Sequence, residues 1–530
     1  MSKSPTPLCL RKTGVPRQAG HKTTQPGYLN KVSNLSIARV ALVIASFCVP
    51  NPSVHAQSAP RNIAFEPYSL RTYDGQAHPV ELGKISIPEA RSTPSGRSLN
   101  VAFLRLKSIS ARPGAPIVFL MGGPGIPATV IAPIPPYWQL FDALRASGDV
   151  ILLDQRGLGL SAPALDCPRL KEPLDTALLT SQRAFIAAYR KVVSSCAGYW
   201  RDKGINPRAY TDAAIADDVD DIRKALGVPR VSILGFSYGT RLAMTFVRRH
   251  PERVERVVLQ GPTDADLEYH AFPAHDSLLA RIASFAAADS VAGSFSKNLV
   301  GRLRSLFDRA AAQPFLVKIR RPTGDSVVIP VGREGLRGLV EGHLTDSRIP
   351  AFVATTEQGD LTILTRWVEG VYNDFSGGAG TLMARAITCS ARASAARRAA
   401  VDASASRSIF GPAFDNFASD PVFCDALGGT STVSEPRRAK RVEAPVLFIT
   451  GELDDRTPVG NDVTLASEFT NSVRIIVPNG GHELLPDPAI RDVVVDFFAG
   501  RDVRRRSLRN DPPRFLSIEE AKKPPRRRGQ

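Results

Sequence analysis

This 530-residue sequence lacks several signals that would assign a function class directly. It contains no Cys-x-x-Cys pair and no His-Glu-x-x-His motif, so it predicts no metal site, and we expect no cofactor. The apolar run at residues 40–49 is too short for a membrane-spanning helix, which needs about 20 residues. No other stretch is apolar enough to cross a membrane. The sequence therefore favours a protein without a transmembrane span whose chemistry depends on its own side chains.

The positive charge is concentrated at the two ends of the chain. Of the formal net charge of +17, residues 1–56 contribute +7 and residues 501–530 contribute +7, which leaves +3 for residues 57–500. We therefore expect no nucleic acid in the core. Residues 501–530 are basic and proline-rich, which predicts a disordered tail with at most a weak contact to an anionic surface.

Residues 1–56 have the composition of an export signal. Basic residues precede the apolar run, and the small-residue site Val54-His55-Ala56 follows it. This order predicts a signal peptide cleaved after Ala56 and a secreted or periplasmic protein. Lipidation at Cys48 is the alternative, although Phe47 stands where a lipidation site requires a small residue.

Four cysteines remain after this leader, namely Cys167, Cys196, Cys389 and Cys424. An even number of cysteines in an exported chain favours disulfide bonds. Because the first two and the last two are close in sequence, we favour Cys167–Cys196 and Cys389–Cys424 among the three connectivities that four cysteines allow. Buried free thiols are the alternative.

Short apolar runs rich in Val, Ile and Leu recur along the chain. Such runs are typical of parallel strands covered on both faces, and amphipathic segments between them predict helices. The alternation predicts an α/β fold with a mostly parallel central sheet flanked by helices. The predicted strands with continuous apolar runs are residues 116–121, 149–154, 231–236, 254–260, 444–450 and 473–477, and the predicted helices are residues 212–226, 238–250 and 489–499. Residues 80–88 and 99–107 alternate apolar and polar residues, which predicts half-buried strands.

One long interval interrupts this alternation. Residues 262–441 contain amphipathic helical stretches but no comparable apolar strand, and strands resume after them. We therefore predict an inserted helical cap over the carboxyl edge of the sheet, where the sites of α/β proteins lie. The predicted organisation is a signal peptide (1–56), a core in two parts (57–261 and 442–500), the cap (262–441) and the basic tail (501–530).

A candidate nucleophile lies in the pentapeptide Gly235-Phe236-Ser237-Tyr238-Gly239, which ends a predicted strand and opens a predicted helix. Small residues around a serine permit the sharp strand–turn–helix geometry that exposes its hydroxyl group. A serine hydroxyl is a weak nucleophile, so it needs a base and a third group that orients the base. We therefore predict that Ser237 is the nucleophile of a serine hydrolase.

The base and its carboxylate are predicted from two other strand ends. His482 lies in the loop after residues 473–477, and Asp454 follows residues 444–450. Their order in the chain, with the carboxylate between serine and histidine, is that of the nucleophile-elbow hydrolases. Asp455 is the neighbouring alternative, which spacing alone does not exclude, but we favour Asp454. The predicted triad is Ser237, Asp454 and His482.

The negative charge of a tetrahedral intermediate needs backbone N–H donors. One donor is predicted to be Tyr238, directly after the nucleophile at a helix N-terminus. The other is expected in the loop Gly122-Gly123-Pro124-Gly125 after a predicted strand, where we favour Gly123. The predicted oxyanion hole is therefore formed by Gly123 and Tyr238.

Together with Asp154-Gln155-Arg156-Gly157, these motifs resemble the α/β-hydrolase fold. More closely, they resemble the proline iminopeptidase and tripeptidyl-aminopeptidase-like group of serine peptidases, over residues 110–265 and 440–500. The resemblance implies that Ser237, Asp454 and His482 carry the catalytic roles and that the enzyme releases N-terminal residues from peptides. A carboxylesterase with the same triad, and a non-catalytic binding protein on this fold, are the alternatives.

The sequence departs from this group at two places. Met121 stands where the histidine ahead of the double glycine is usual, and Ser390-Ala391-Arg392 replaces acidic residues that many relatives carry after the cap cysteine. An aminopeptidase needs carboxylates that bind the ammonium group of its substrate. The sequence leaves this substrate-binding set unassigned, and the candidates in the cap are Glu334, Glu341, Glu357, Asp360 and Glu369.

Overall fold

The computed structural model of the protein describes residues 62–268, 272–378, 380–390, 393–411, 421–429 and 442–524. The predicted signal peptide, residues 1–56, lies outside the described residues, as do residues 525–530. In the part of the chain that is described, no helix has the length and apolar character needed to cross a membrane.

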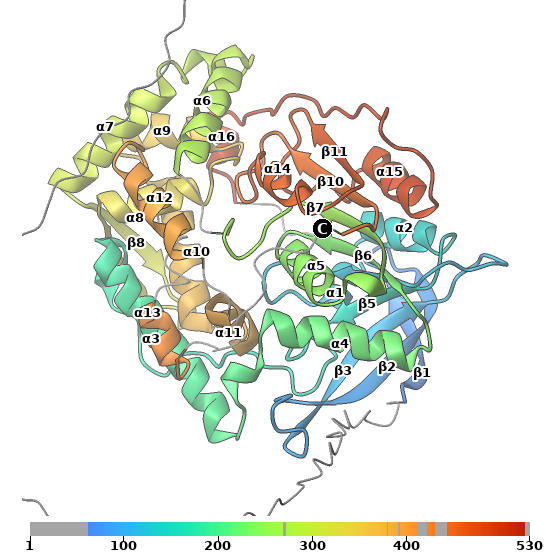
Figure 1. The fold of residues 1–530 in the computed structure, drawn as a ribbon. Coiled ribbons are helices and arrows are strands. Elements are labelled where there is room, and N and C mark those ends of the chain that lie inside the picture. The colour runs from blue at the N-terminus through green and yellow to red at the C-terminus, as the bar shows by residue number, and fades with distance from the viewer. Residues whose placement is uncertain are drawn as a thin grey trace, which may run out of the picture. The chain divides into compact units, whose positions relative to one another are not determined.

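A nine-stranded sheet forms the centre of the fold (Figure 1). Neighbouring strands from β5 to β11 are parallel, whereas β1, β2, β3 and β5 pair antiparallel. In spatial order the strands are β1 (Ala64–Arg71), β2 (Ala77–Pro88), β3 (Ser98–Leu106), β5 (Val150–Asp154), β4 (Ile117–Leu120), β6 (Val231–Phe236), β7 (Val254–Gln260), β10 (Val446–Gly451) and β11 (Ser472–Val477). Sequence reasoning missed β1, because this edge strand is largely exposed and lacks an apolar run.

Helices cover both faces of the parallel strands, which explains their continuous apolar runs. Val118 and Leu120 of β4 belong to one apolar cluster, and Ile117 and Phe119 to another, because successive side chains point to opposite faces. The first cluster includes α4 (Asp212–Ala225), α5 (Tyr238–Arg249) and α14 (Asn461–Ala466), and the second includes α1 (Ala128–Ile131), α2 (Pro135–Leu144) and α15 (Pro488–Phe498). The fold is therefore the predicted α/β fold with a mostly parallel sheet flanked by helices.

A third apolar cluster lies in the interval predicted to be the cap. The interval is largely helical, as predicted, but it also contains an antiparallel hairpin of β8 (Phe315–Arg320) and β9 (Ser326–Val331). In β8, buried and exposed residues alternate, so the strand lacks the continuous apolar run used to recognise strands. The helices are α6 (Phe272–Ala288), α7 (Leu299–Ala312), α8 (Arg333–Glu341), α9 (Ile349–Glu357), α10 (Thr362–Gly377), α11 (Leu382–Ser390), α12 (Ala395–Ala405) and α13 (Pro421–Ala426).

Residues before this interval also contribute to the same cluster. Leu178 and Leu179, in a short 3-10 helix at Thr176–Leu179, pack there together with Ala188 and Val192 of α3 (Gln182–Asp202). Both favoured disulfide bonds are present, with S–S distances of 2.01 Å for Cys167–Cys196 and 2.10 Å for Cys389–Cys424. The first bond anchors α3, and the second joins α11 to α13.

The prediction of a disordered tail is wrong for residues 501–524. Val503 is buried in the cluster of α2 and α15, and the Asn510 N–H donates to the Pro478 carbonyl at 3.0 Å. The Asn479 side chain donates in turn to the Asn510 carbonyl at 2.9 Å. The segment is therefore attached to the loop that carries His482.

The same segment then reaches the helices of the cap (Figure 1). Phe515 and Ala521 are buried in the cap cluster, and Ala521 ends the short helix α16 (Ile518–Ala521). Lys522 forms an ion pair with Asp360 at 2.9 Å. A few apolar side chains between the arginines thus pack into the apolar clusters and hold the segment in place, although its average composition is that of a disordered tail.

Phe515→Ala is expected to destabilise the protein by about 3–5 kcal/mol, the usual cost of removing a buried phenylalanine ring. Phe515 is only 5% exposed within the cap cluster. The adjacent Arg514 is exposed, so Arg514→Ala is the matched control and should change stability by less than about 0.5 kcal/mol. Thermal unfolding of both variants is the measurement. Equal melting temperatures would show that the segment does not stabilise the cap.

Candidate active site

Ser237 occupies a sharp turn between β6 and α5. Its φ and ψ are 54° and −126°, a conformation that is unfavourable for a residue with a side chain. A Cβ atom at Gly239 would lie 1.8 Å from the Leu120 carbonyl oxygen, and one at Gly235 would lie 2.8 Å from the Gly239 carbonyl oxygen. Both positions therefore require glycine for steric reasons, which accounts for the local sequence pattern.

The three predicted catalytic residues lie together at the carboxyl ends of β6, β10 and β11. His482 Nε2 is 2.9 Å from Ser237 Oγ, and His482 Nδ1 is 2.9 Å from each oxygen of the Asp454 carboxylate. Gln260 at the end of β7 donates its side-chain amide to the His482 carbonyl at 2.9 Å. The imidazole thus bridges a hydroxyl group and a carboxylate, as proton transfer from a serine requires.

The carboxylate of Asp454 is enclosed by hydrogen-bond donors. It accepts bonds from the backbone N–H groups of Arg456 and Thr457 at 2.9 Å and 2.8 Å, and from the Thr457 hydroxyl at 2.6 Å. Its side chain is fully buried. These bonds hold the carboxylate against the imidazole, and Thr457 is a residue that sequence reasoning missed although it belongs to the same loop motif.

Asp455, the alternative carboxylate, points toward the cap. It accepts a hydrogen bond from the Thr345 hydroxyl at 3.1 Å. Burial raises the pKa of Asp455, while the nearby Arg456 guanidinium acts in the opposite direction. The structure therefore brings Asp454 to the imidazole and leaves Asp455 in the wall of the cleft.

The two predicted oxyanion donors line the same cleft as Ser237. The loop after β4 lies directly over the nucleophile, because a Cβ atom at Gly122 would be 2.8 Å from Ser237 Cβ and 3.2 Å from the Tyr238 nitrogen. Gly123 has a φ of 119°, which only glycine adopts readily. The backbone of this loop and the start of α5 are thus both close to the serine.

Met121, which replaces the usual histidine ahead of the double glycine, helps to fix the oxyanion loop through its burial and its carbonyl group. The Met121 side chain is buried in the cluster of α2 and α15. Its carbonyl accepts a hydrogen bond from the Gln155 side-chain amide at 2.9 Å, in a buried position. The base of the oxyanion loop is therefore held by Gln155.

Asp154 and Arg156, which flank Gln155 in the sequence, have structural roles. The Asp154 carboxylate accepts bonds from the Thr129 backbone and hydroxyl and from the Leu160 backbone. Arg156 is completely buried and forms a bidentate salt bridge with Asp218, in which Nε is 2.7 Å from Oδ2 and Nη2 is 2.6 Å from Oδ1. This motif fixes the loops beneath the site and does not contribute a group to the cleft.

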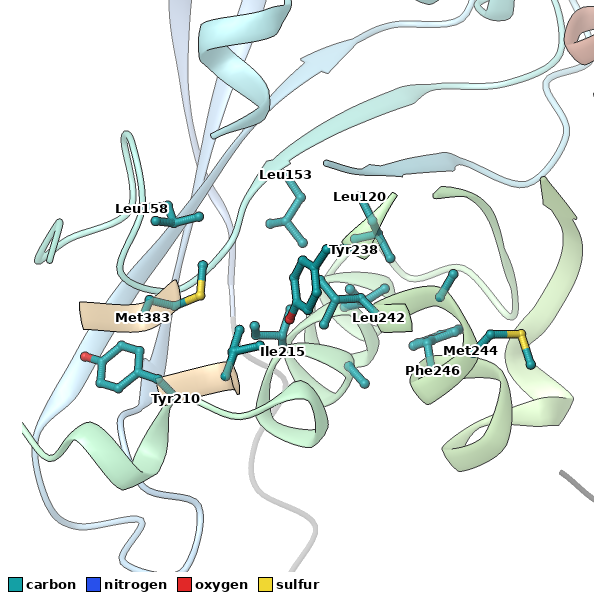
Figure 2. Packing of buried hydrophobic residues seen from close by; sticks show 14 of the residues in the cluster. Leu120, Leu153, Leu158, Tyr210, Ile215, Tyr238, Leu242, Met244, Phe246 and Met383 are labelled. Carbon is teal, nitrogen blue, oxygen red and sulfur yellow. The ribbon is translucent and has the colours of Figure 1, made fainter. Parts of the chain in front are cut away.

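The Tyr238 side chain lies within the apolar core cluster that includes α4 and α5 (Figure 2). Figure 2 shows its ring among Leu120, Leu153 and Leu242. Its hydroxyl donates to Asp212 at 2.7 Å, and burial together with that carboxylate raises the pKa of the phenol well above its usual value. Tyr238 thereby anchors the first turn of α5, while its backbone nitrogen stays at the cleft.

The cleft has a volume of about 370 Å³ and is bounded by two sets of elements. The loops after β4, β6, β7 and β10 form one side, and residues of α6, α8 and α11 form the other. Of the predicted ammonium-binding candidates, only Glu341 lies in this wall, and Glu369 does not line the cleft. The other three have partners elsewhere: Glu334 accepts a hydrogen bond from the Gln182 backbone, Glu357 pairs with Arg302, and Asp360 pairs with Lys522. Ser390 bonds to Asp212, and the rest of that departure, Ala391-Arg392, lies outside the described residues.

Sequence reasoning missed several charged groups in the cleft. Glu268, in the loop after β7, pairs with Arg241, whose guanidinium also pairs with Asp212 at 2.5 Å. Burial and the Asp212 carboxylate raise the pKa of Glu268, although Arg241 acts in the opposite direction. His275 of α6 pairs with Glu341 at 2.6 Å. No local pattern in the sequence distinguishes Glu268 or His275.

The arrangement can support acyl transfer by a serine hydroxyl. A base touches the hydroxyl, a buried carboxylate touches the base, and a glycine loop adjoins the nucleophile. Within the described ranges, no cluster of three or more His, Cys, Asp or Glu side chains could hold a metal ion.

Comparisons with known proteins identify the family of the chain. Residues 115–489 match the family described as "alpha/beta hydrolase fold". The chain is 28% identical over 194 residues to the serine protease Hip1 of Mycobacterium tuberculosis (strain H37Rv), covering 35% of this chain and 36% of that protein. It is 29% identical over 194 residues to the tripeptidyl aminopeptidase of Streptomyces coelicolor, covering 34% of this chain and 35% of that protein.

The matched region thus spans about a third of the length of these relatives. Among solved structures, a serine hydrolase from Cycloclasticus zankles is 14% identical, with a TM-score of 0.33, and the match covers 79% of this chain and 98% of that one. The resemblance noted from the sequence motifs is confirmed at the level of the family and its peptidase relatives.

Proposed function

Because this chain belongs to the alpha/beta hydrolase fold family, we propose that it is a serine hydrolase whose natural reaction is the release of N-terminal residues from peptides. The proposal of a serine hydrolase rests on the continuous chain of hydrogen bonds from Asp454 through His482 to Ser237, each about 2.9 Å long. The peptidase relatives favour a peptide bond as the target.

In the proposed reaction, Ser237 Oγ attacks the carbonyl carbon of the scissile bond while His482 Nε2 takes the hydroxyl proton. Asp454 holds the proton on Nδ1 and stabilises the imidazolium. The N–H groups of Gly123 and Tyr238 donate to the oxyanion of the tetrahedral intermediate. His482 then protonates the leaving amine, the C–N bond breaks, and a water molecule that His482 activates releases the acyl group from the serine.

Glu268 is the group that we propose for the ammonium ion of the substrate. It lies in the cleft with Ser237, and its side chain is 31% exposed, so a ligand can reach it. Arg241 faces two carboxylates at once, those of Glu268 and Asp212, which leaves an excess of negative charge there. A free N-terminal ammonium group would supply the missing positive charge, and it would form a charge-assisted hydrogen bond.

Turnover of Ala-Ala-Ala 2-naphthylamide and of its N-acetylated form tests this proposal. The free amine should have the higher kcat/KM by about 100-fold, the usual range for pairing a charge in a largely enclosed site. Glu268→Gln should reduce this preference, because it removes the charge and keeps the shape. Glu369→Gln, which changes a cap carboxylate outside the cleft, is the matched control.

Equal turnover of the free and acetylated substrates would contradict the aminopeptidase proposal and would favour an endopeptidase. Hydrolysis of p-nitrophenyl acyl esters without any cleavage of peptides would instead favour the carboxylesterase alternative. Absence of all turnover would favour a binding protein on this fold.

We also propose that the protein works outside the cytoplasm. The two disulfide bonds support this location, because such bonds persist in oxidising compartments.

A further inference from the structure

Arg456 lies beside the candidate catalytic residues, and its side chain is exposed in the cleft. Its backbone N–H donates at 2.9 Å to Asp454 Oδ1, the oxygen that is also 2.9 Å from His482 Nδ1. The next residue, Thr457, bonds to the same carboxylate and is buried. The backbone of Arg456 is thus fixed within the site while its guanidinium group extends from it.

The guanidinium of Arg456 differs from the other charged groups of the cleft wall. Among the described residues it forms no ion pair and no hydrogen bond. The other ionisable side chains there all have partners: Arg241 bonds to Asp212 and Glu268, His275 to Glu341, and Asp455 to Thr345. The charge of Arg456 acts on the neighbouring Asp455 carboxyl, but no hydrogen bond or ion pair among the described residues occupies the guanidinium, so its N–H donors are available to a ligand.

We propose that Arg456 binds a carboxylate of the substrate, an inference that rests on the proposed peptidase function and specifies its substrate class. The planar guanidinium fork matches a carboxylate through two parallel hydrogen bonds. With Glu268 for the ammonium group, the cleft offers opposite charges to the two ends of one molecule. The substrates are then short peptides with a free C-terminal carboxylate, or peptides with an acidic side chain close to the scissile bond.

Binding to the Ser237→Ala protein tests this inference without turnover. Isothermal titration calorimetry would compare Ala-Ala-Ala-Ala with its C-terminal amide, and Ala-Ala-Asp amide with Ala-Ala-Asn amide. The first pair reports a terminal carboxylate and the second an acidic side chain. We expect the charged member of at least one pair to bind about tenfold more tightly, as charge-assisted hydrogen bonds do.

Arg456→Gln, added to Ser237→Ala, should reduce this preference to about twofold or less, and Arg456→Glu should reverse it. Arg304→Gln is the matched control, because Arg304 is also exposed and unpaired among the described residues but lies on α7, outside the cleft. It should leave the preference unchanged. Equal binding within both pairs, or a preference that survives Arg456→Gln, would overturn the inference.

Failure of this inference and failure of the proposed function are separable. Tight, Arg456-dependent binding of peptides that the wild-type protein does not cleave would support the carboxylate site and reject the peptidase. Cleavage of peptides without any preference for a carboxylate would support the peptidase and reject the role of Arg456.

Discussion

Ser237→Ala is expected to reduce kcat by about 10⁶-fold, the loss seen when the nucleophile of a serine hydrolase is removed. The variant retains the glycines on both sides of the turn, and alanine fits where serine does, so the fold should be unchanged. The measurement combines turnover of Ala-Ala-Ala 2-naphthylamide with covalent labelling by a fluorophosphonate. We expect strong labelling of the wild-type protein and none of the variant.

The control for this experiment is the thermal unfolding of both proteins, since equal melting temperatures show that the loss is chemical. Retention of labelling in Ser237→Ala would place the nucleophile elsewhere. The mechanism built on the contact between Ser237 and His482 would then be wrong.

Asp454→Asn is expected to reduce kcat by about 10⁴-fold, and Asp455→Asn by less than about tenfold. An asparagine amide at position 454 can donate to Nδ1, which favours the tautomer with its proton on Nε2. That proton would face Ser237 Oγ and prevent His482 from acting as a base. The carboxylate of Asp455 bonds to Thr345 and not to the imidazole, so its loss leaves the tautomer unchanged.

These two substitutions form a matched pair, because they make the same chemical change at neighbouring residues. Values of kcat and KM for both variants, with thermal unfolding as the stability control, are the measurements. A larger loss in Asp455→Asn than in Asp454→Asn would show that the assignment of the carboxylate is wrong. Equal losses would indicate that the loop acts as a unit.

The parts of the fold that the sequence predicted are those with strong local patterns. The runs that became β4, β6 and β10 are buried on both faces, so most of their residues are apolar. The edge strand β1 was missed because most of its residues are exposed, and β8 was missed because buried and exposed residues alternate along it. The short strand β9 is mostly apolar but lies in the interval that was expected to be helical.

The residues of the candidate site likewise fall into those that a local pattern predicted and those that the sequence did not reveal. Ser237 was predicted because the turn around it requires glycine at fixed spacing, and this steric requirement is visible in the sequence. Glu268, His275 and Arg241 were missed as a group, because their significance depends on the contacts that α6, α8 and the loop after β7 make with one another.

The C-terminal segment shows why average composition is an incomplete guide. Residues 501–524 are rich in arginine, yet Val503 and Phe515 are buried in two different apolar clusters. Burial of one or two large side chains can offset the entropy lost on ordering a short segment. The partners of those side chains lie far away in the sequence, so composition did not reveal them.

By itself, the sequence determined the strands of the central sheet other than β1, the helices α4, α5 and α15, the serine turn and the chain order of serine, aspartate and histidine. These follow from local steric rules and from the spacing of apolar residues. Only the tertiary structure decided which of two adjacent aspartates faces the imidazole, which charges face the serine and how the C-terminal segment joins the core to the cap helices. Each of these depends on side-chain direction or on contacts between residues hundreds of positions apart, which no local pattern encodes.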